Sequence, residues 1–436
     1  MSVARGLARL AARPLQRPGL ATWGARAAAS ARLSRREASE PWAAVLAIAG
    51  GALLLGARGP PACEEQGVDV KVTTYNVLAP KLCNAKHYPK CPPGTTEHEA
   101  RLPKVMARME SAVANRTIIG LQEVDLLWAG KLHVFFAERG YHVAFAQYGK
   151  QFNGYMGVLI AWPCDKYEAL DVDISRVSDT APAGTWPKAD ANSGLAPFGF
   201  LTWWGMKDVL GCAPPDQSGA SEDWEWKAAR DRFNETVMVR LRPRGEPQSP
   251  SFCVATYHMP CFFGSPEKVR VVNIHTYLLL RKLRDFSADD PAILMGDFNF
   301  QPHSSSYALA ASGGSFEAAA GRSLEELQGL GERLPAGAPW PQGLQSAYQA
   351  FHKKEPLFTN FAQTSGQSEP FVETLDYIWY SPGVLRVVDC PPLPQTREGV
   401  AGPFPNTVEP SDHLPVHATF RLGQGTSKAS GTSARL

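Results

Sequence analysis

Six short apolar segments of the chain each carry a polar residue, of a kind that catalytic sites use, at or near one end. Five of them, residues 70–77, 117–124, 252–258, 291–297 and 373–380, are short apolar runs, several of them rich in β-branched residues, which predicts strands. The polar residues that they carry are Asn76, Glu123, His258, Asp297 and Asp376. The sixth is an apolar run expected next to residues 411–415, with Asp412 and His413 at its end. Because a strand end holds a side chain rigidly, the pattern predicts a strand-built core with a polar cleft.

The chemistry of these residues is that of phosphoester hydrolysis. Carboxylates can hold a divalent cation or activate water, and His and Asn can hold phosphate oxygens as negative charge builds up. Asp412 next to His413 forms one such pair, and Asp297 two residues before Asn299 forms another. An isolated Asp-His is commonly a surface pair, and an isolated Asp-Phe-Asn is commonly a turn. The complementary set taken together favours a single metal-assisted catalytic site.

These segments, in this order, resemble the endonuclease/exonuclease/phosphatase superfamily over roughly residues 68–423. Three stretches narrow the resemblance to its deadenylase branch, which holds nocturnin, the carbon-catabolite-repression deadenylase, the Angel proteins and the mitochondrial 2′,5′-phosphodiesterase. The three stretches are residues 75–79 with 87–92, residues 355–361 and residues 374–381. The resemblance implies an α/β fold with four layers: two mixed β-sheets face to face, flanked by helices.

The resemblance also implies a role for each matched residue. Glu123 would be the principal metal ligand, with Asn76 beside it and Asp412 near the same cation. Asp297 would orient or deprotonate the attacking water, Asn299 would hold a phosphate oxygen, and His258 would bind the scissile phosphate. Asp376 would orient His413, which stabilises the transition state or acts as an acid–base group. The oxygen-rich ligand set suits Mg²⁺, for which Mn²⁺ would substitute.

Substrate recognition is expected to differ from that of the deadenylase branch. The residues before His258 are Thr256 and Tyr257, where the branch usually has Asn-Thr, and the bulky Tyr257 is expected to reshape the phosphate rim. Asn153 stands where the branch has an acid, which changes the expected base recognition. Together with Asn234, these two residues are the candidate substrate-binding residues.

The composition fits one large catalytic domain over residues 64–425, followed by a flexible tail at 426–436. The formal net charge is only +2, so the chain lacks the strongly basic character of proteins that bind long nucleic acid. Residues 163–230, rich in Pro, Gly and Trp, are interpreted as an insertion: either a long surface loop or an aromatic platform that stacks bases. Residues 304–350 are a second insertion, mainly structural, with a short helix near 323–327.

The amino-terminal region has the composition of a targeting segment. Residues 1–36 contain eight arginines and no acidic residue, which is typical of an organelle presequence; a disordered basic tail is the alternative. An uncharged run follows at 42–57, somewhat short for a membrane span of about 20 residues. We therefore expect residues 1–41 to direct the protein to mitochondria, with 42–57 as an inner-membrane anchor or second sorting signal. The arginine pair at 35–36 leaves a plastid route open.

The sequence thus predicts a divalent-metal-dependent phosphodiesterase. RNA 3′ ends or adenine-containing oligonucleotides are the first expected substrates, which makes it a deadenylase-like 3′ exoribonuclease. One alternative is a nucleotide phosphatase of the NADP(H) type or another small phosphoester hydrolase, and a second is a non-catalytic RNA-binding scaffold. No obligate protein partner is evident. A scaffold would not need to keep both Asp297 and Asp412.

Overall fold

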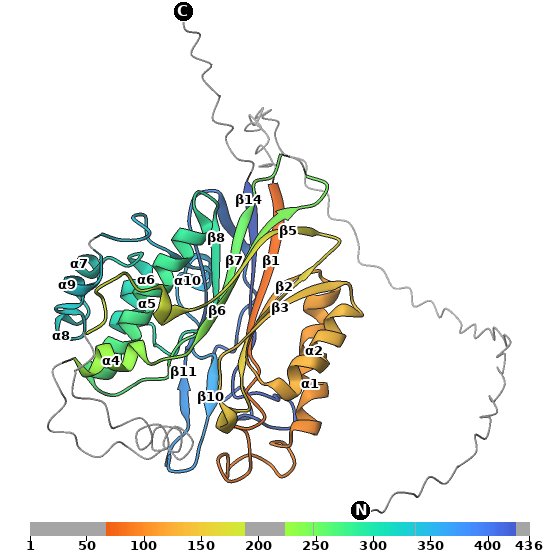
Figure 1. Cartoon of the computed structure of the whole chain (residues 1–436). Coiled ribbons are helices and arrows are strands. Elements are labelled where there is room, and N and C mark those ends of the chain that lie inside the picture. The colour runs from red at the N-terminus through yellow and green to blue at the C-terminus, as the bar shows by residue number, and fades with distance from the viewer. Residues whose placement is uncertain (1–66, 188–222, 247, 336, 424–436) are drawn as a thin grey trace, which may run out of the picture. The chain divides into compact units, whose positions relative to one another are not determined.

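The computed structural model describes residues 67–187, 223–246, 248–335 and 337–423 (Figure 1). The expected presequence at 1–41, the apolar run at 42–57 and the tail at 426–436 lie outside these residues. Within the described part, no helix combines the length and the apolar character needed to cross a membrane.

Two six-stranded mixed sheets form the centre of the fold. The first has the order β13-β14-β1-β2-β4-β3 and the second β5-β6-β7-β8-β12-β9, while β10 and β11 form a separate two-stranded ribbon. In chain order the strands are β1 Gly67–Asn76, β2 Ile118–Val124, β3 Tyr141–Gln147, β4 Gly157–Pro163, β5 Tyr167–Arg176, β6 Glu235–Pro243, β7 Phe252–His258, β8 Ala292–Asp297, β9 Gln345–Ser346, β10 Asn360–Ala362, β11 Phe371–Glu373, β12 Asp376–Tyr380, β13 Leu385–Asp389 and β14 Val416–Gly423.

Each sheet has one parallel pair near its middle, β1 with β2 and β7 with β8, and every other pairing in the two sheets is antiparallel. A helix connects the two strands of each parallel pair, as parallel neighbours require. The helices are α1 His98–Ala114, α2 Leu126–Ala137, α4 Trp224–Arg230, α5 Pro266–Ser287, α6 Ser305–Ala311, α7 Phe316–Ala319, α8 Leu324–Leu327, α9 Leu330–Arg333 and α10 Ala347–His352, with 3₁₀ turns η1 Gln151–Asn153 and η2 Val177–Thr180.

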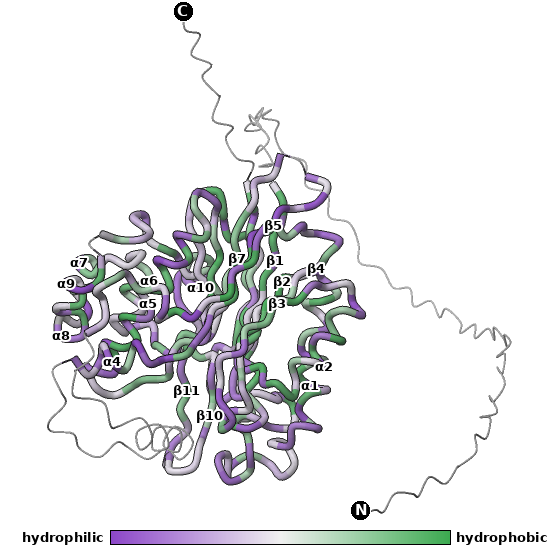
Figure 2. The backbone as a smooth tube through the Cα atoms, viewed as in Figure 1, coloured by the Kyte–Doolittle hydropathy of each residue, from purple (hydrophilic) through white to green (hydrophobic). Residues whose placement is uncertain are grey.

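Three apolar layers hold the domain together. Val72, Val239 and Ile293 belong to the cluster between the sheets, which both sheets supply. A second cluster joins the outer face of the first sheet to α1 and α2, and a third joins the outer face of the second sheet to α5 and its neighbouring helices. Figure 1 shows α1 and α2 on one side of the strands and α4 to α9 on the other, and Figure 2 shows hydrophobic residues concentrated along the central strands. The predicted four-layer α/β fold is confirmed.

The described parts of the two predicted insertions contain helices and strands as well as loops. Within 163–230, β5 pairs with β6 at the edge of the second sheet, and α4 packs against α5. Trp186 packs against the core cluster around α5. The aromatic run at 198–204 lies outside the described residues, so the base-stacking platform stays a prediction. Within 304–350, α6 to α9 and the start of α10 form, and α8 covers part of the helix expected near 323–327.

Candidate active site

The carboxyl ends of both parallel strand pairs meet at one polar site. Asn76 is the last residue of β1, Glu123 is the penultimate residue of β2, and His258 and Asp297 end β7 and β8. The register aligns His258 with Asp297, and Asp297 in turn with Asp376, the first residue of β12. Every one of these side chains is buried. The predicted strand-end residues are therefore brought together, from both sheets, at the same edge.

Asn76 links two carboxylates that come from different sheets. Its side-chain amide nitrogen donates to Oε1 of Glu123 and to Oδ2 of Asp297, each at 2.9 Å. Its amide oxygen accepts from the backbone N–H of Leu78 at 2.9 Å, which fixes the orientation of the amide. The second oxygen of Glu123 accepts from the backbone N–H of Ala79 at 2.9 Å. Asn76 thus presents a donor to the two acids, whereas the role implied by the resemblance placed it beside the metal.

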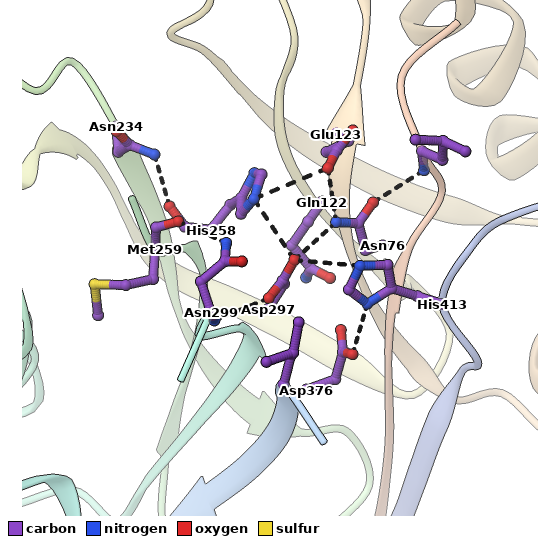
Figure 3. A network of polar contacts seen from close by, with 12 residues as sticks. Asn76, Gln122, Glu123, Asn234, His258, Met259, Asp297, Asn299, Asp376 and His413 are labelled. Atoms are coloured by element: carbon purple, nitrogen blue, oxygen red, sulfur yellow. Dashed lines mark hydrogen bonds and ion pairs between the residues drawn. The ribbon is translucent and has the colours of Figure 1, made fainter. Parts of the chain in front are cut away.

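Two imidazoles flank Asp297 (Figure 3). The Nε2 atoms of His258 and His413 each lie 3.6 Å from Oδ2 of Asp297, and Nε2 of His258 lies 4.0 Å from Oε1 of Glu123. The other ring nitrogen of His258 lies 2.7 Å from the hydroxyl of Tyr148, which fixes the orientation of the ring. Both rings therefore direct Nε2 toward the same carboxylate oxygen.

A buried carboxylate and a threonine hold His413. Oδ2 of Asp376 lies 2.7 Å from Nδ1 of His413 and accepts from the hydroxyl of Thr359 at 2.6 Å. Burial raises the pKa of Asp376 to about 6, although His413 opposes that rise. Burial would lower the pKa of His413, but the carboxylates of Asp376, Asp297 and Asp412 raise it well above its usual range. The neighbouring carboxylates thus favour the protonated form of His413, whose Nε2 faces the site.

The segment that carries Asp412 and His413 precedes strand β14, so the prediction that these residues close an apolar run is wrong. The segment is held by β10: the backbone N–H of Phe361 donates to the carbonyl of Asp412, and that of Leu414 to the carbonyl of Thr359. Oδ2 of Asp412 accepts from the hydroxyl of Tyr88 at 2.9 Å. Backbone pairing with this segment and the hydrogen bond from Tyr88 therefore fix the loop that carries Asp412 and His413.

Strained backbone occurs at two residues of the site. Glu123 and Asn299 have φ angles of +60° and +48°, which non-glycine residues rarely adopt. At Asn299 this turn lets its backbone N–H donate to Oδ1 of Asp297, while its side chain donates to the carbonyl of Met259. The strain is consistent with a backbone that is held for function.

The predicted substrate-binding residues divide into two groups. Asn153 and Asn234 line the cavity at the site, and the amide of Asn234 donates to the backbone carbonyl of His258 at 2.8 Å. Tyr257 does not line the cavity, and its assignment is wrong. Its side chain is fully buried, and its hydroxyl bonds to Nδ1 of His275 on α5. Because side chains alternate along a strand, Tyr257 faces the helix layer when His258 faces the cavity.

The cavity has a volume of about 430 Å³, within the range of small-ligand pockets. Glu123, His258, Asp297, Asn299, Asp412 and His413 all lie along its wall. The wall also contains aromatic rings, those of Phe152, Phe233, Phe263 and Phe371. A ligand in this cavity would therefore meet both the polar cluster and aromatic rings.

Several residues that support the site were not predicted individually. Tyr88 and Thr359 lie in two of the stretches that carry the deadenylase resemblance, so that signal could have found them. Arg101 on α1 is fully buried and donates to the backbone carbonyls of Val77, Leu78 and Pro410. It therefore joins the loop after Asn76 to the loop before Asp412.

The arrangement offers two groups of potential metal donors within the described residues: Glu123, His258 and Asp297, and Asp297, Asp376 and His413. In each group the ligand atoms lie within 4.8 Å of one another. Asp412 belongs to neither group, although it lines the same cavity. Buried carboxylates so close together favour a cation that offsets their charge.

Comparison with known proteins identifies the family. The model of the Endonuclease/Exonuclease/phosphatase family matches residues 73–413. Nocturnin from Drosophila melanogaster is 25% identical over 203 residues, which are 45% of this chain and 29% of that protein. The CCR4-Not complex 3′-5′-exoribonuclease subunit Ccr4 from Aspergillus niger is 24% identical over 395 residues, 81% of this chain and 52% of that protein. The chain thus spans about half or less of the length of these relatives.

A solved structure agrees with the fold. The crystal structure of ANGEL2, a 2′,3′-cyclic phosphatase, in complex with adenosine-2′,3′-vanadate has a TM-score of 0.55 and 20% sequence identity, and the match covers 82% of this chain and 96% of that one. The family match takes in every residue of the polar cluster, from Asn76 to His413. The chain is therefore a member of the endonuclease/exonuclease/phosphatase family.

Proposed function

We propose that this chain is a divalent-metal-dependent phosphodiesterase that removes nucleotides from the 3′ ends of RNA or of adenine-containing oligonucleotides. The observation that carries the proposal is the convergence of two imidazole Nε2 atoms on Oδ2 of Asp297, each at 3.6 Å. This oxygen lies beside Glu123, across the bridging amide of Asn76. A phosphate in the adjoining cavity would meet cationic and hydrogen-bonding groups. A base of the same nucleotide would meet the aromatic rings of the cavity wall.

Each residue has a role that follows from its contacts. Asp297 is the group placed to orient or deprotonate the attacking water, because its Oδ2 is the centre of the cluster (Figure 3). His413, held protonated by the neighbouring carboxylates, stabilises the negative charge that develops on the phosphate oxygens. Nε2 of His258 is free to meet a second phosphate oxygen while Tyr148 holds the opposite nitrogen.

The donor set fits a divalent cation that prefers oxygen. Glu123 and Asp297 present buried carboxylate oxygens, and Asp412 adds a third carboxylate on the cavity wall. Glu123 would hold the ion, and Mg²⁺ or Mn²⁺ suits carboxylate ligands. Asn76 would act on the cation indirectly, by fixing the spacing of Glu123 and Asp297. When bound, the ion would polarise the phosphate and lower the pKa of bound water.

Two observations favour RNA over other phosphoesters. The relatives include Ccr4, named a 3′-5′-exoribonuclease subunit, and nocturnin. The aromatic part of the cavity wall offers ring faces on which unpaired bases stack, a contact worth about 1–3 kcal/mol per base. The cavity is also large enough for a mononucleotide, so a nucleotide phosphatase is the second candidate.

A cleavage assay with the full chain tests the proposal. A 5′-labelled oligoadenylate incubated with Mg²⁺ or Mn²⁺ should give a ladder of products shortened from the 3′ end, and chelator should abolish it. NADPH and a 2′,3′-cyclic phosphate oligonucleotide, assayed in parallel by phosphate release and by end-group change, separate the phosphatase alternatives. Undiminished cleavage in excess chelator would contradict the metal requirement, and RNA binding without any hydrolysis would favour the scaffold.

A further inference from the structure

Three hollows adjoin one another on the described surface, and the first is the catalytic cavity. The second has a volume of about 440 Å³ and shares Phe263, Asn299 and Phe371 with the first. The third has a volume of about 900 Å³ and shares Arg322 with the second. The hollows therefore neighbour one another in a series that begins at the reacting groups and passes the loop between β8 and α6.

The series follows strand β12 away from the site. Asp376 at the start of β12 belongs to the catalytic cluster, and Trp379 and Tyr380 at its end line the third hollow. Asp376 and Tyr380 are four residue steps apart along the extended strand, a span of roughly 13 Å. A ligand that fills the catalytic cavity alone would leave the third hollow empty, so only an extended ligand can use the whole series.

The outer hollows carry positive charge. Arg322, at the junction of the second and third hollows, is exposed and forms no ion pair with a described carboxylate. Lys353 and Arg386 line the third hollow. Two acids oppose this charge: Glu326 in the second hollow, and Glu355 in the third. Glu355 is engaged by the hydroxyl of Tyr307, and burial raises its pKa.

Aromatic rings lie beside these charges. Phe263 and Phe371 stand at the junction of the first two hollows, with ring centroids 6.0 Å apart. Phe351 lines the third hollow and is 42% exposed, which leaves a ring available for stacking. Basic groups with interspersed aromatic faces are the combination that binds single-stranded nucleic acid without requiring a particular sequence.

We propose that the second and third hollows form a track for the body of a single-stranded polynucleotide whose 3′-terminal phosphodiester lies in the catalytic cavity. The track rests on the proposed function and extends it, because it makes a polymer the preferred substrate over a mononucleotide. Arg322 and Lys353 would neutralise backbone phosphates, and Phe351 would stack with a base. Such contacts act on binding and leave the chemical step unchanged.

Substrates of different length test the track separately from the catalytic site. In the full chain, the double variant Arg322→Glu with Lys353→Glu should raise KM for a twelve-nucleotide oligoadenylate about tenfold or more. It should leave kcat/KM for the dinucleotide ApA unchanged and reduce the salt dependence of oligonucleotide binding. The control is Lys131→Glu with Arg242→Glu, two exposed cations that line none of the three hollows and make the same change in charge.

A direct binding measurement distinguishes a failure of the proposed track from a failure of the proposed function. Fluorescence anisotropy with labelled oligoadenylates of two and twelve nucleotides measures the track whether or not the chain hydrolyses them. Tighter binding of the longer strand, lost in the Arg322–Lys353 double variant and kept in the control, supports the track. Equal affinity for both lengths, or an equal loss in the control, overturns it. A wild-type chain that binds with this length dependence but does not cleave would refute only the proposed function.

Discussion

The contacts of Asp376 predict an unusually small cost for replacing it by asparagine. Oδ2 of Asp376 accepts two hydrogen bonds, from Thr359 and from His413, while Oδ1 has no hydrogen-bond partner among the residues that the structure describes. Oγ1 of Thr359 already accepts the backbone N–H groups of Leu375 and Asp376. Its own hydrogen must therefore point at residue 376, which requires an oxygen there. An asparagine should thus keep its carbonyl oxygen in the place of Oδ2, where it still accepts the Nδ1–H of His413.

The magnitude follows from the lost charge. Asp376→Asn replaces the ionised acceptor of His413 by a neutral amide oxygen, and an ionised partner roughly doubles the strength of such a bond. With about 1.5–3 kcal/mol for the charged bond and about 1 for the neutral one, the transition state loses roughly 0.5–2 kcal/mol. Turnover should fall by about 2- to 30-fold. Asp376→Ala, which removes both acceptors, should cost about a hundredfold or more.

Thr359 supplies the decisive comparison. Adding Thr359→Val to Asp376→Asn releases the amide, so that its nitrogen can turn to Nδ1 of His413. An amide N–H would then face the Nδ1–H, and His413 would lose the acceptor that orients and stabilises its protonated ring. The combined loss should then approach that of Asp376→Ala. The assay is kcat on a labelled oligonucleotide, with thermal unfolding to confirm folding and with Asp389→Asn, an exposed acid on β13, as the control. If Asp376→Asn alone is as damaging as Asp376→Ala, or if Thr359→Val adds nothing, the reasoning is refuted.

Three further predictions concern stability and sorting. Burial lowers the pKa of His275 to about 4, so below about pH 6.5 the unfolded state takes up a proton that the folded state does not. The free energy of unfolding should therefore fall by about 3 kcal/mol between pH 6.5 and 4. Denaturant titration over this range should find a smaller fall in His275→Gln. Arg101→Met should lower the free energy of unfolding by roughly 3 kcal/mol or more, because three backbone carbonyls lose a donor. An unchanged denaturation midpoint would contradict the role of Arg101 in joining the loops after Asn76 and before Asp412. We also propose that residues 1–60 direct a fused fluorescent protein to mitochondria; cytosolic fluorescence would contradict the presequence, and plastid import would favour the alternative route.

Apolar runs that end on polar residues predicted much of the site, because each sheet has a parallel strand pair whose carboxyl ends lie at the site. Asn76, Glu123, His258 and Asp297 all follow from apolar runs that end on polar residues, and parallel neighbours place such ends at one edge. The assignment of Tyr257, which came from comparison with the deadenylase motif before His258, failed because adjacent residues on a strand face opposite sides. Its neighbour His258 takes the cavity side, which leaves Tyr257 to the helix layer.

Contacts between distant segments could not be read from local pattern. Tyr88 reaches Asp412 across 324 residues, and Tyr148 reaches His258 across 110. Neither tyrosine lies at the end of an apolar run of the kind that marked the catalytic residues. The orientation of the Asn76 amide could not be predicted from the sequence either, because it depends on the backbone N–H of Leu78 and on carboxylates from two sheets. Residue types and strand ends therefore indicated which groups meet, but not which of them hold the others in place.

Metal binding measured on the full chain tests the central claim most directly. The claim is that Glu123, with Asp297 beside it, holds a divalent cation that the hydrolysis of a phosphoester requires. Calorimetric titration with Mn²⁺ should show a binding event that Glu123→Gln weakens at least tenfold, with cleavage of the labelled oligoadenylate lost in parallel. Glu168→Gln, at an exposed position on β5, should behave as the wild type. Unchanged Mn²⁺ affinity and unchanged metal-dependent cleavage in Glu123→Gln would contradict the account.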